Sequence, residues 1–314
     1  MAAIVTLTMN PALDIATATG RVVPSHKLRC DRPRYDPGGG GINVARTVHA
    51  LGGDALAIFP VGGAAGEMIR HLLKEEGVAH QAVGIAGFTR ESLNIDERAT
   101  GQQYRFILPG PELGVADQER CLDALAAAAS SAAFIVASGS LPVGVPEDFY
   151  ARVADVAKRY GRRFILDTSG PALKAAGKGV YLLKPSLREL EELAGRAVGG
   201  EAEELAAARE LIEQGRSEVV VLSLGARGAL LVTEQMAERF AAIPVAAKST
   251  VGAGDSMLAG IILGLNRGLA LSEAVRFGMA AGAAALLGSG TQLCRYDDVV
   301  RLYAQAPASA AQGR

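Results

Sequence analysis

The stretch Ser249-Thr250-Val251-Gly252-Ala253-Gly254-Asp255-Ser256 combines a glycine-rich turn, an acidic residue just after it, and the start of an apolar run with helical spacing. Glycines let the backbone bend tightly and bring several N–H groups close to a ligand. The first turn of the following helix adds unpaired donors and a partial positive charge, so phosphate can bind there. A carboxylate at Asp255 is then placed to take a proton from a hydroxyl beside that phosphate. The stretch predicts a phosphoryl-transfer site.

A plainer interpretation of this stretch stays open. Residues 252–255 could be only a turn, with Asp255 as an ordinary helix-capping residue. The stretch also differs from the Walker phosphate loop, because no Gly-Lys-Ser/Thr follows the glycines. A kinase with this turn must therefore neutralise phosphate charge with other groups.

The composition narrows the classes of partner. The 314 residues are enough for a sizeable core, in one large α/β domain or two ordinary ones. The net charge of −1 gives no reason to expect nucleic acid or a membrane surface as a partner, and no apolar run approaches the length that spans a bilayer. No secretory signal is evident, and three scattered cysteines suit neither a disulfide framework nor a zinc site. We therefore expect a cytoplasmic protein that acts on small molecules.

Short apolar runs alternate with amphipathic stretches along most of the chain. This pattern is typical of a mostly parallel sheet covered by helices on both faces, where ligands collect at the carboxyl ends of the strands. Gly139, Asp167, Lys184 and Gly225 each follow an apolar run. The predicted strands are 4–8, 55–61, 133–137, 163–167, 180–183, 219–224 and 229–233, and the clearest predicted helices are 43–51, 67–76, 117–130, 146–160, 203–214, 255–266 and 272–287.

Residues 12–36 and 88–111 interrupt this alternation, since they are polar, rich in Thr, Arg and Tyr, and carry period-two patches. They predict antiparallel strands outside the main sheet, which form a small β-sheet lid over its edge. A surface hairpin without a function is the alternative. The main domain then comprises residues 1–11, 37–87 and 112–309, and residues 310–314 are expected to form a frayed tail.

Four consecutive glycines, Gly38 to Gly41, precede Asn43 and an Ala/Val-rich helix. Each glycine costs extra conformational entropy, so the run is easiest to explain where backbone approaches a polar ligand; a flexible linker is the alternative. Asn43 could bond sugar hydroxyls. Asp14, at the end of the first strand, could accept two vicinal hydroxyls or cap a turn.

Basic residues and two further turns complete the candidates. Lys27, Arg90 and Arg105 lie in the lid segments and could meet over a phosphate, although each taken alone is an ordinary surface charge. Lys184-Pro185-Ser186 opens a helix, and Glu189 could hold a hydrated magnesium or simply favour the helix dipole. The turn from Ser223 through Gly225 to Gly228 suits a nucleotide or a hairpin.

Together these motifs resemble the ribokinase-like (pfkB) carbohydrate kinase family nearly from end to end. Residues 38–45 are similar to its N-terminal sugar-binding signature and residues 250–255 to its C-terminal signature. Further segments, at 6–8, 27–30, 103–106, 138–142 and 290–294, are similar to the branch that phosphorylates fructose 6-phosphate. The resemblance implies a ribokinase-like three-layer α/β/α fold with a mostly parallel central sheet, and a homodimer whose lid strands pair between subunits. It also implies ATP-dependent, magnesium-assisted transfer to the C1 hydroxyl of fructose 6-phosphate, a step of glycolysis that gives fructose 1,6-bisphosphate.

The resemblance assigns roles to the candidates. Asp255 would be the general base, and the amides of Gly252, Ala253 and Gly254 the anion hole. The sugar phosphate would be held by Asp14, Lys27, Gly39, Gly40, Asn43, Arg90, Arg105 and Ser138. The nucleotide site would comprise Lys184, Ser186, Ser223, Gly225, Gly228 and Thr250 with Gly252 and Gly254, and Glu189 would serve the magnesium ion.

One residue departs from the family pattern. The family usually has Asn-x-x-Glu after the Lys-Pro, and here Ser186 replaces the Asn while Glu189 remains. Metal or nucleotide affinity could differ for that reason. The activities of 1-phosphofructokinase and tagatose-6-phosphate kinase stay open, as does an inactive sugar-phosphate-sensing protein. Also open are a potassium ion near Ser249 and Val251, inhibition by excess ATP, and the preferred phosphate donor.

Overall fold

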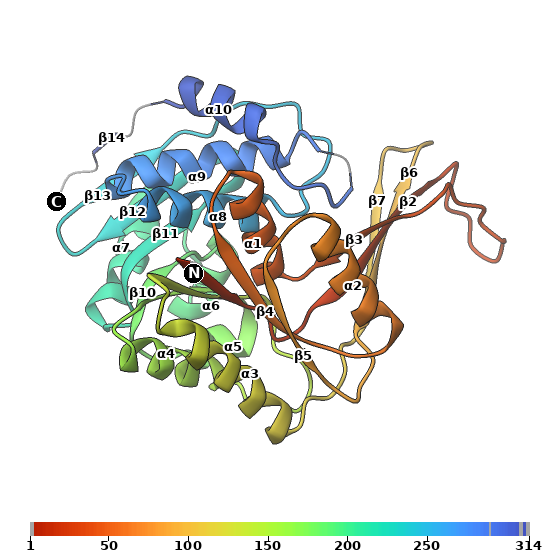
Figure 1. The fold of residues 1–314 in the computed structure, drawn as a ribbon. Helices are drawn as coiled ribbons and strands as arrows, with labels where there is room; N and C mark the ends of the chain where they lie inside the picture. Colours follow the sequence, from red (N-terminus) through yellow and green to blue (C-terminus); the bar gives the residue numbers. More distant parts are fainter. Residues whose placement is uncertain (1–2, 289, 308–309, 312–314) are drawn as a thin grey trace.

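The structure, a computed structural model, describes residues 3–288, 290–307 and 310–311 (Figure 1). Within these residues the chain forms a ten-stranded main sheet and a four-stranded sheet that projects to one side. The main sheet, in spatial order, consists of β14 (Ala310–Ala311), β13 (Ala237–Phe240), β12 (Ala229–Thr233), β11 (Ser217–Ser223), β10 (Val180–Leu183), β9 (Arg163–Asp167), β8 (Phe134–Ser138), β1 (Ile4–Leu7), β4 (Ala55–Val61) and β5 (His80–Gly84).

The strands from β11 to β5 pair in parallel, and β12, β13 and β14 add antiparallel pairs at one edge. Successive side chains of a strand point to opposite faces. In β11, Val219 and Val221 belong to one buried cluster, and Val220 and Leu222 to the other. The continuous apolar runs in the sequence are therefore explained by two cores, one on each face of the sheet.

Helices cover both faces, so the predicted three-layer α/β/α architecture is confirmed (Figure 1). One layer contains α1 (Gly40–Ala50), α2 (Gly63–Glu75), α8 (Ala253–Asn266), α9 (Leu271–Ala285) and α10 (Tyr296–Gln305). The other contains α3 (Val115–Ala129), α4 (Phe149–Arg159), α5 (Gly170–Ala175), α6 (Leu187–Ala194) and α7 (Glu201–Glu213). A 3-10 turn, η1 (Gly225–Arg227), joins β11 to β12.

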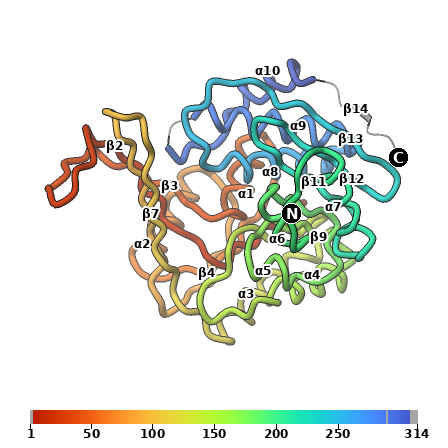
Figure 2. The backbone as a smooth tube through the Cα atoms, turned by 180° about the vertical axis from the view of Figure 1, so that it is seen from behind, coloured from red at the N-terminus to blue at the C-terminus, as the bar shows by residue number. Residues whose placement is uncertain are grey.

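The projecting sheet, hereafter the lid, has the order β3 (Arg34–Gly38), β2 (Ala12–Thr19), β6 (Arg90–Glu97), β7 (Gln103–Ile107). Seen from behind, its strands extend beyond the helices and main sheet (Figure 2). The outer pairs are antiparallel as predicted, but the central pair β2–β6 is parallel, so the prediction was wrong there. The reason is topological: β2 and β6 follow β1 and β5, which are both parallel strands of the main sheet, and the two leave that sheet in the same direction.

The C-terminal end also differs from expectation. Ala310 and Ala311 pair with Arg239 and Glu238 of β13, so the predicted frayed tail is wrong for these two residues, and residues 312–314 lie outside the described part of the chain. Among the described helices, none has the length and apolar character needed to cross a bilayer.

Candidate active site

The glycine turn and the first turn of α8 form the centre of the site. Gly252 has a φ of 72°, a left-handed conformation that favours glycine, and α8 begins directly after it at Ala253. The first four N–H groups of a helix have no carbonyl partner within it, so this end can bind an anion. The helix begins two residues before the predicted start, which places Ala253 and Gly254 inside its first turn.

Asp255 lies on that first turn and faces the start of another helix. Its Oδ2 accepts a 2.9 Å hydrogen bond from Nδ2 of Asn43, which lies on the first turn of α1. The hydroxyl oxygens of Thr47, one turn beyond Asn43, and of Ser256, the residue after Asp255, lie 3.4 Å apart and join the same two helices. The positive ends of two helix dipoles therefore point toward one region, which favours negative charge between them.

The surroundings of Asp255 raise the pKa of its carboxyl to about 6. Burial is the largest cause, and the nearby carboxylate of Asp167 adds to it, while the Asn43 hydrogen bond, Lys184 and Arg105 act in the opposite direction. At neutral pH the carboxyl is therefore mostly ionised and still basic enough to accept a proton. These are the properties that a general base needs.

Lys184 supplies the positive charge that the glycine turn lacks. Its Nζ lies 3.1 Å from Oδ2 of Asp167, and a Cβ atom added to Gly254 would lie 3.5 Å from the same nitrogen. Burial lowers the pKa of Lys184, but Asp167, Asp255 and Glu189 outweigh it and keep the pKa above its ordinary value. The ammonium group therefore stays charged beside the anion-binding turn. Asp167 is the last residue of β9, and only the structure shows that it holds this lysine.

Three of the sugar-site candidates lie on one face of the lid. In the strand register Arg90 pairs with Ala12, Asp14 with Ser92, and Arg105 with Asn94, so their side chains share the face that carries Asp14. The positive charges of Arg90 and Arg105 both act on the Asp14 carboxyl, and Arg105 also acts on Asp255. The lid thus brings two arginines and a carboxylate to the edge of the reaction centre.

Partners that the sequence did not reveal fix these arginines. Asn10 accepts two hydrogen bonds from Arg90, at its side-chain oxygen (3.0 Å) and its carbonyl (3.2 Å), and Asn94 accepts a 3.1 Å bond from Arg105. Burial raises the pKa of Asp14 to about 6 even though Arg90 lowers it. A carboxylate held in this way can accept sugar hydroxyls.

The glycine run packs closely against the ends of the strands. A Cβ on Gly38 would lie 2.3 Å from Oδ2 of Asp14, one on Gly39 would lie 2.7 Å from Cγ2 of Thr8, and one on Gly40 would lie 2.2 Å from Oγ of Ser138. Only glycine allows so close an approach. The run therefore has a structural reason within the protein, in addition to any ligand, and Ser138 contacts this backbone from the end of β8.

Some of the nucleotide candidates line a cavity of about 300 Å³. Ser223, Gly225, Gly228, Thr250 and Gly254 belong to its lining, whereas Lys184, Ser186 and Gly252 do not. Its remaining walls include Ala253, already a candidate for the anion hole, and apolar residues that the sequence did not single out for the site: Met257, Met279, Gly282, Ala283 and Leu286, which read as helix core, and Ala242 and Ile243, which follow β13. A mostly apolar cavity with a few polar groups suits an adenine ring.

Ser186 pairs with Ser223 of this cavity and, together with Glu189, caps a helix. The backbone N–H of Ser186 donates a 2.8 Å hydrogen bond to Oε2 of Glu189, and the N–H of Glu189 donates to the Ser186 hydroxyl at 3.4 Å, a capping box at the start of α6. Among the described residues, no group of three or more His, Cys, Asp or Glu side chains could hold a metal ion. Magnesium at Glu189 would therefore need phosphate oxygens and water to complete its shell.

Lys27 is not brought to these residues within the chain. It lies in the exposed loop beyond Thr19, which pairs with Glu97, whereas Arg90 pairs with Ala12 at the other end of β2. Seven residue steps of β-strand separate these ends, roughly 23 Å. Within the chain, the expected cluster of Lys27, Arg90 and Arg105 is thus reduced to the two arginines.

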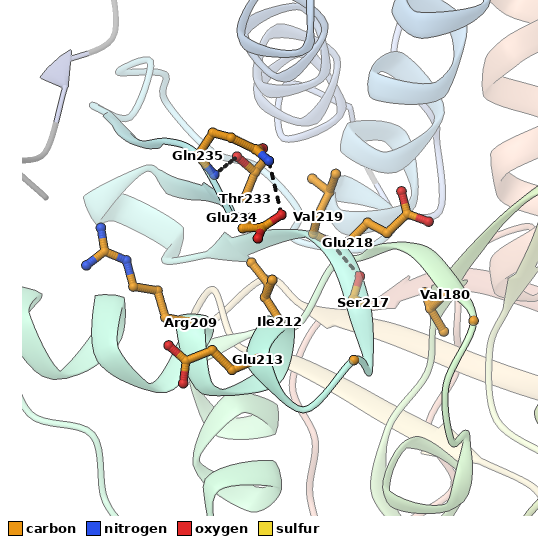
Figure 3. A pocket seen from close by; sticks show the side chains of 12 residues that line it. Val180, Arg209, Ile212, Glu213, Ser217, Glu218, Val219, Thr233, Glu234 and Gln235 are labelled. Atoms are coloured by element: carbon orange, nitrogen blue, oxygen red, sulfur yellow. Dashed lines mark hydrogen bonds between the residues drawn. The ribbon is translucent and has the colours of Figure 1, made fainter.

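A larger cavity, about 740 Å³, lies at the amino-terminal ends of β10 and β11 (Figure 3). It is lined by exposed carboxylates such as Glu213, Glu218 and Glu234 around Ile212 and Val219. None of the predicted site residues belongs to it. In parallel α/β sheets, ligands bind at the carboxyl ends of the strands. The residues around Asp255 therefore form the candidate active site.

Comparisons with known proteins agree with this geometry. Residues 7–298 match the family described as pfkB family carbohydrate kinase. The chain belongs to this family. A pfkB relative from Mycobacterium tuberculosis, named ATP-dependent 6-phosphofructokinase isozyme 2, is 57% identical over 300 residues, which cover 96% of this chain and 88% of the relative.

Two solved structures of Escherichia coli phosphofructokinase-2 are also similar. One, in complex with potassium, has a TM-score of 0.92, and the other, in complex with fructose-6-phosphate, has a TM-score of 0.91. Both are 42% identical in sequence and cover 97% of this chain and 99% of their own. The pfkB assignment and the ribokinase-like fold predicted from the motifs are thereby confirmed.

Proposed function

We propose that this protein is an ATP-dependent 6-phosphofructokinase, which transfers a phosphoryl group to the C1 hydroxyl of fructose 6-phosphate. The observation that carries the proposal is the position of Asp255. Its carboxylate contacts Asn43 on the sugar side and lies one residue from Gly254, which lines the nucleotide cavity. The names of the similar proteins from M. tuberculosis and E. coli support the choice of fructose 6-phosphate.

In this proposal each group has one task. Asp14 and Asn43 hold sugar hydroxyls, and Arg90 and Arg105 bind the phosphate that the sugar already carries, as bidentate guanidinium groups do well. Asp255 takes the proton of the attacking hydroxyl. The first amides of α8 and the Lys184 ammonium stabilise the charge of the transferred group, which is the main requirement of phosphoryl transfer. ATP supplies that group, and Glu189 would help to hold a magnesium ion, which would neutralise charge on the phosphates.

A substrate panel tests the proposal. We expect ADP release to be fastest, in kcat/KM, with fructose 6-phosphate, compared with fructose 1-phosphate and tagatose 6-phosphate. A preference for fructose 1-phosphate would indicate a 1-phosphofructokinase, and one for tagatose 6-phosphate a tagatose-6-phosphate kinase. Binding of a sugar phosphate without ADP release from any of the three would favour an inactive sensing protein.

Potassium is proposed as an activator at the segment before the glycine turn. The hydroxyl of Ser249 donates a 2.7 Å hydrogen bond to the carbonyl of Gly290 and accepts one from the N–H of Val251 at 3.2 Å. This contact gathers backbone from two loops, and carbonyl oxygens are common potassium ligands. Replacing potassium chloride by tetramethylammonium chloride should lower kcat; equal activity in both salts would refute the proposal.

A further inference from the structure

A buried carboxylate, that of Glu204, binds side chains from two segments that form one wall of the nucleotide cavity. Glu204 of α7 is 0% exposed, although an isolated charge is costly to bury. Two arginines surround it: Nη1 of Arg227 lies 2.6 Å from its Oε1, and Nη2 of Arg239 donates a 2.8 Å hydrogen bond to its Oε2. Glu204 has no role in the proposed phosphoryl transfer.

The two arginines come from the two segments that form one wall of the cavity. Arg227 lies in η1, between Gly225 and Gly228, and both of these glycines line the cavity. Arg239 lies in β13, which leads directly to Ala242 and Ile243 in the same lining. One carboxylate therefore connects both segments to α7.

The two segments also touch each other. A Cβ on Gly228 would lie 1.9 Å from the carbonyl oxygen of Phe240 and 2.7 Å from the amide nitrogen of Ala242. Because the contact is so close, any displacement of η1 moves the segment beside it. The position of the wall thus depends on the side chains that hold it from behind.

We infer that Glu204 is a positioning residue for the nucleotide: by binding Arg227 and Arg239 it fixes the turn and the strand end against which ATP is held. This inference rests on the proposed function, which places ATP in that cavity. Neither Glu204 nor Arg227 lines the cavity itself, so their effect on ATP is transmitted through the backbone of the wall.

The test is the separation of two Michaelis constants. Glu204→Gln keeps the shape of the side chain and removes its charge, and we expect the KM for ATP to rise about tenfold. The kcat and the KM for fructose 6-phosphate should stay within about twofold of wild type, because the other half of the site is untouched. A defect that was merely one of folding would lower the active fraction, and so kcat, without this split.

Two further variants keep the test decisive. Arg227→Gln changes a half-exposed side chain and leaves the Glu204–Arg239 pair, so it should fold even if Glu204→Gln does not, and should raise the KM for ATP about threefold. Glu210→Gln is the matched control, since it removes an exposed ion pair with Arg196 from the same helix and should change neither constant.

ADP binding by isothermal titration calorimetry separates the two possible failures. A wild-type protein that binds no ADP would overturn the proposed function, and this inference with it. A second outcome would overturn this inference alone. In that case the wild-type protein binds ADP, but the KM for ATP is unchanged in Arg227→Gln, and also in Glu204→Gln if that variant folds. A weaker affinity for ADP in these variants, but not in Glu210→Gln, supports it.

Discussion

As the proposed catalytic base, Asp255 has to satisfy two opposing requirements, because such a base must be ionised in a place that excludes water. Burial and Asp167 favour the neutral carboxyl, and Asn43 and Lys184 favour the carboxylate. With a pKa of about 6, roughly nine-tenths of the carboxyl is ionised at pH 7. The neighbouring groups thus keep the base available at a cost in stability.

Replacing this residue should separate activity from stability. We expect Asp255→Asn to lower kcat by roughly 10²–10⁴ and to leave ADP affinity nearly intact, because the anion-binding amides remain. Removing a buried charge should also raise the free energy of unfolding, by about 1 kcal/mol once solvent contact is allowed for. Steady-state kinetics and chemical denaturation measure both. Near-normal turnover would exclude Asp255 as the base.

The raised pKa values of two carboxyls predict that activity falls steeply at acid pH. Both Asp14 and Asp255 have a pKa of about 6. The proposed mechanism uses both of them as carboxylates. As the pH falls through 6, log kcat/KM should drop with a slope approaching two, and in Asp14→Asn the residual activity should drop with a slope of one. The free energy of unfolding changes in the opposite direction. Because folding raises the pKa of these carboxyls, the folded protein takes up protons first, and the free energy of unfolding should increase as the pH falls from about 6 toward 4. A flat profile between pH 5 and 7 would contradict the assignments.

Arg105 should matter for the sugar phosphate more than for ATP. It is exposed on the inner face of the lid, and its charge acts on both Asp14 and Asp255. Arg105→Ala should raise the KM for fructose 6-phosphate by the equivalent of about 1.5–3 kcal/mol, the range for a charge-assisted hydrogen bond. Arg98→Ala, which removes an exposed cation farther along the lid, is the control. An unchanged KM in Arg105→Ala would place the sugar phosphate elsewhere.

Among the elements, those with a strong local pattern were predictable and those set by distant partners were not. Buried strands such as β11 and β12 show continuous apolar runs because helices cover both faces, and α8 is marked by its glycine turn. The parallel pairing of β2 with β6 depends on where β1 and β5 end, which no local pattern encodes. For the same reason, the sequence located Lys184 but not its contact with Asp167, and it could not place Lys27 far from Arg90.

The start of α6 offers a test of the residue that departs from the family pattern. Ser186 caps this helix, and Asn is an equally good N-cap whereas Ala is not. Ser186→Ala should lower the free energy of unfolding by about 1 kcal/mol, and Ser186→Asn should leave it unchanged. If the family residue contributes to metal binding, Ser186→Asn should also lower the magnesium concentration needed for half-maximal rate. Equal stability of all three proteins would show that the cap contributes nothing.

At the scale of the whole molecule, the lid has two different faces. The inner face carries Asp14, Asn94 and Arg105. On the outer face Tyr35, Ile15, Leu93 and Phe106 are neighbours in one row, because Ile15 pairs with both Tyr35 and Leu93, and Leu93 pairs with Phe106. Tyr35 is 41% exposed and Phe106 51%. Apolar side chains gathered on a projecting surface are typical of an interface between proteins.

We therefore propose that this outer face forms the homodimer implied by the family resemblance, and sedimentation velocity tests the proposal. The chain has a mass of 32.4 kDa, so the wild-type protein should sediment as a particle of about twice that mass. Phe106→Glu places a charge in the apolar row and should shift the protein toward the monomer, since an unpaired charge is costly to bury in an interface. Glu213→Lys also changes the charge of an exposed side chain, but at the end of α7, away from the lid, and should leave the dimer intact. If Phe106→Glu sediments like wild type, the subunits associate through another surface, and the apolar row needs a different explanation.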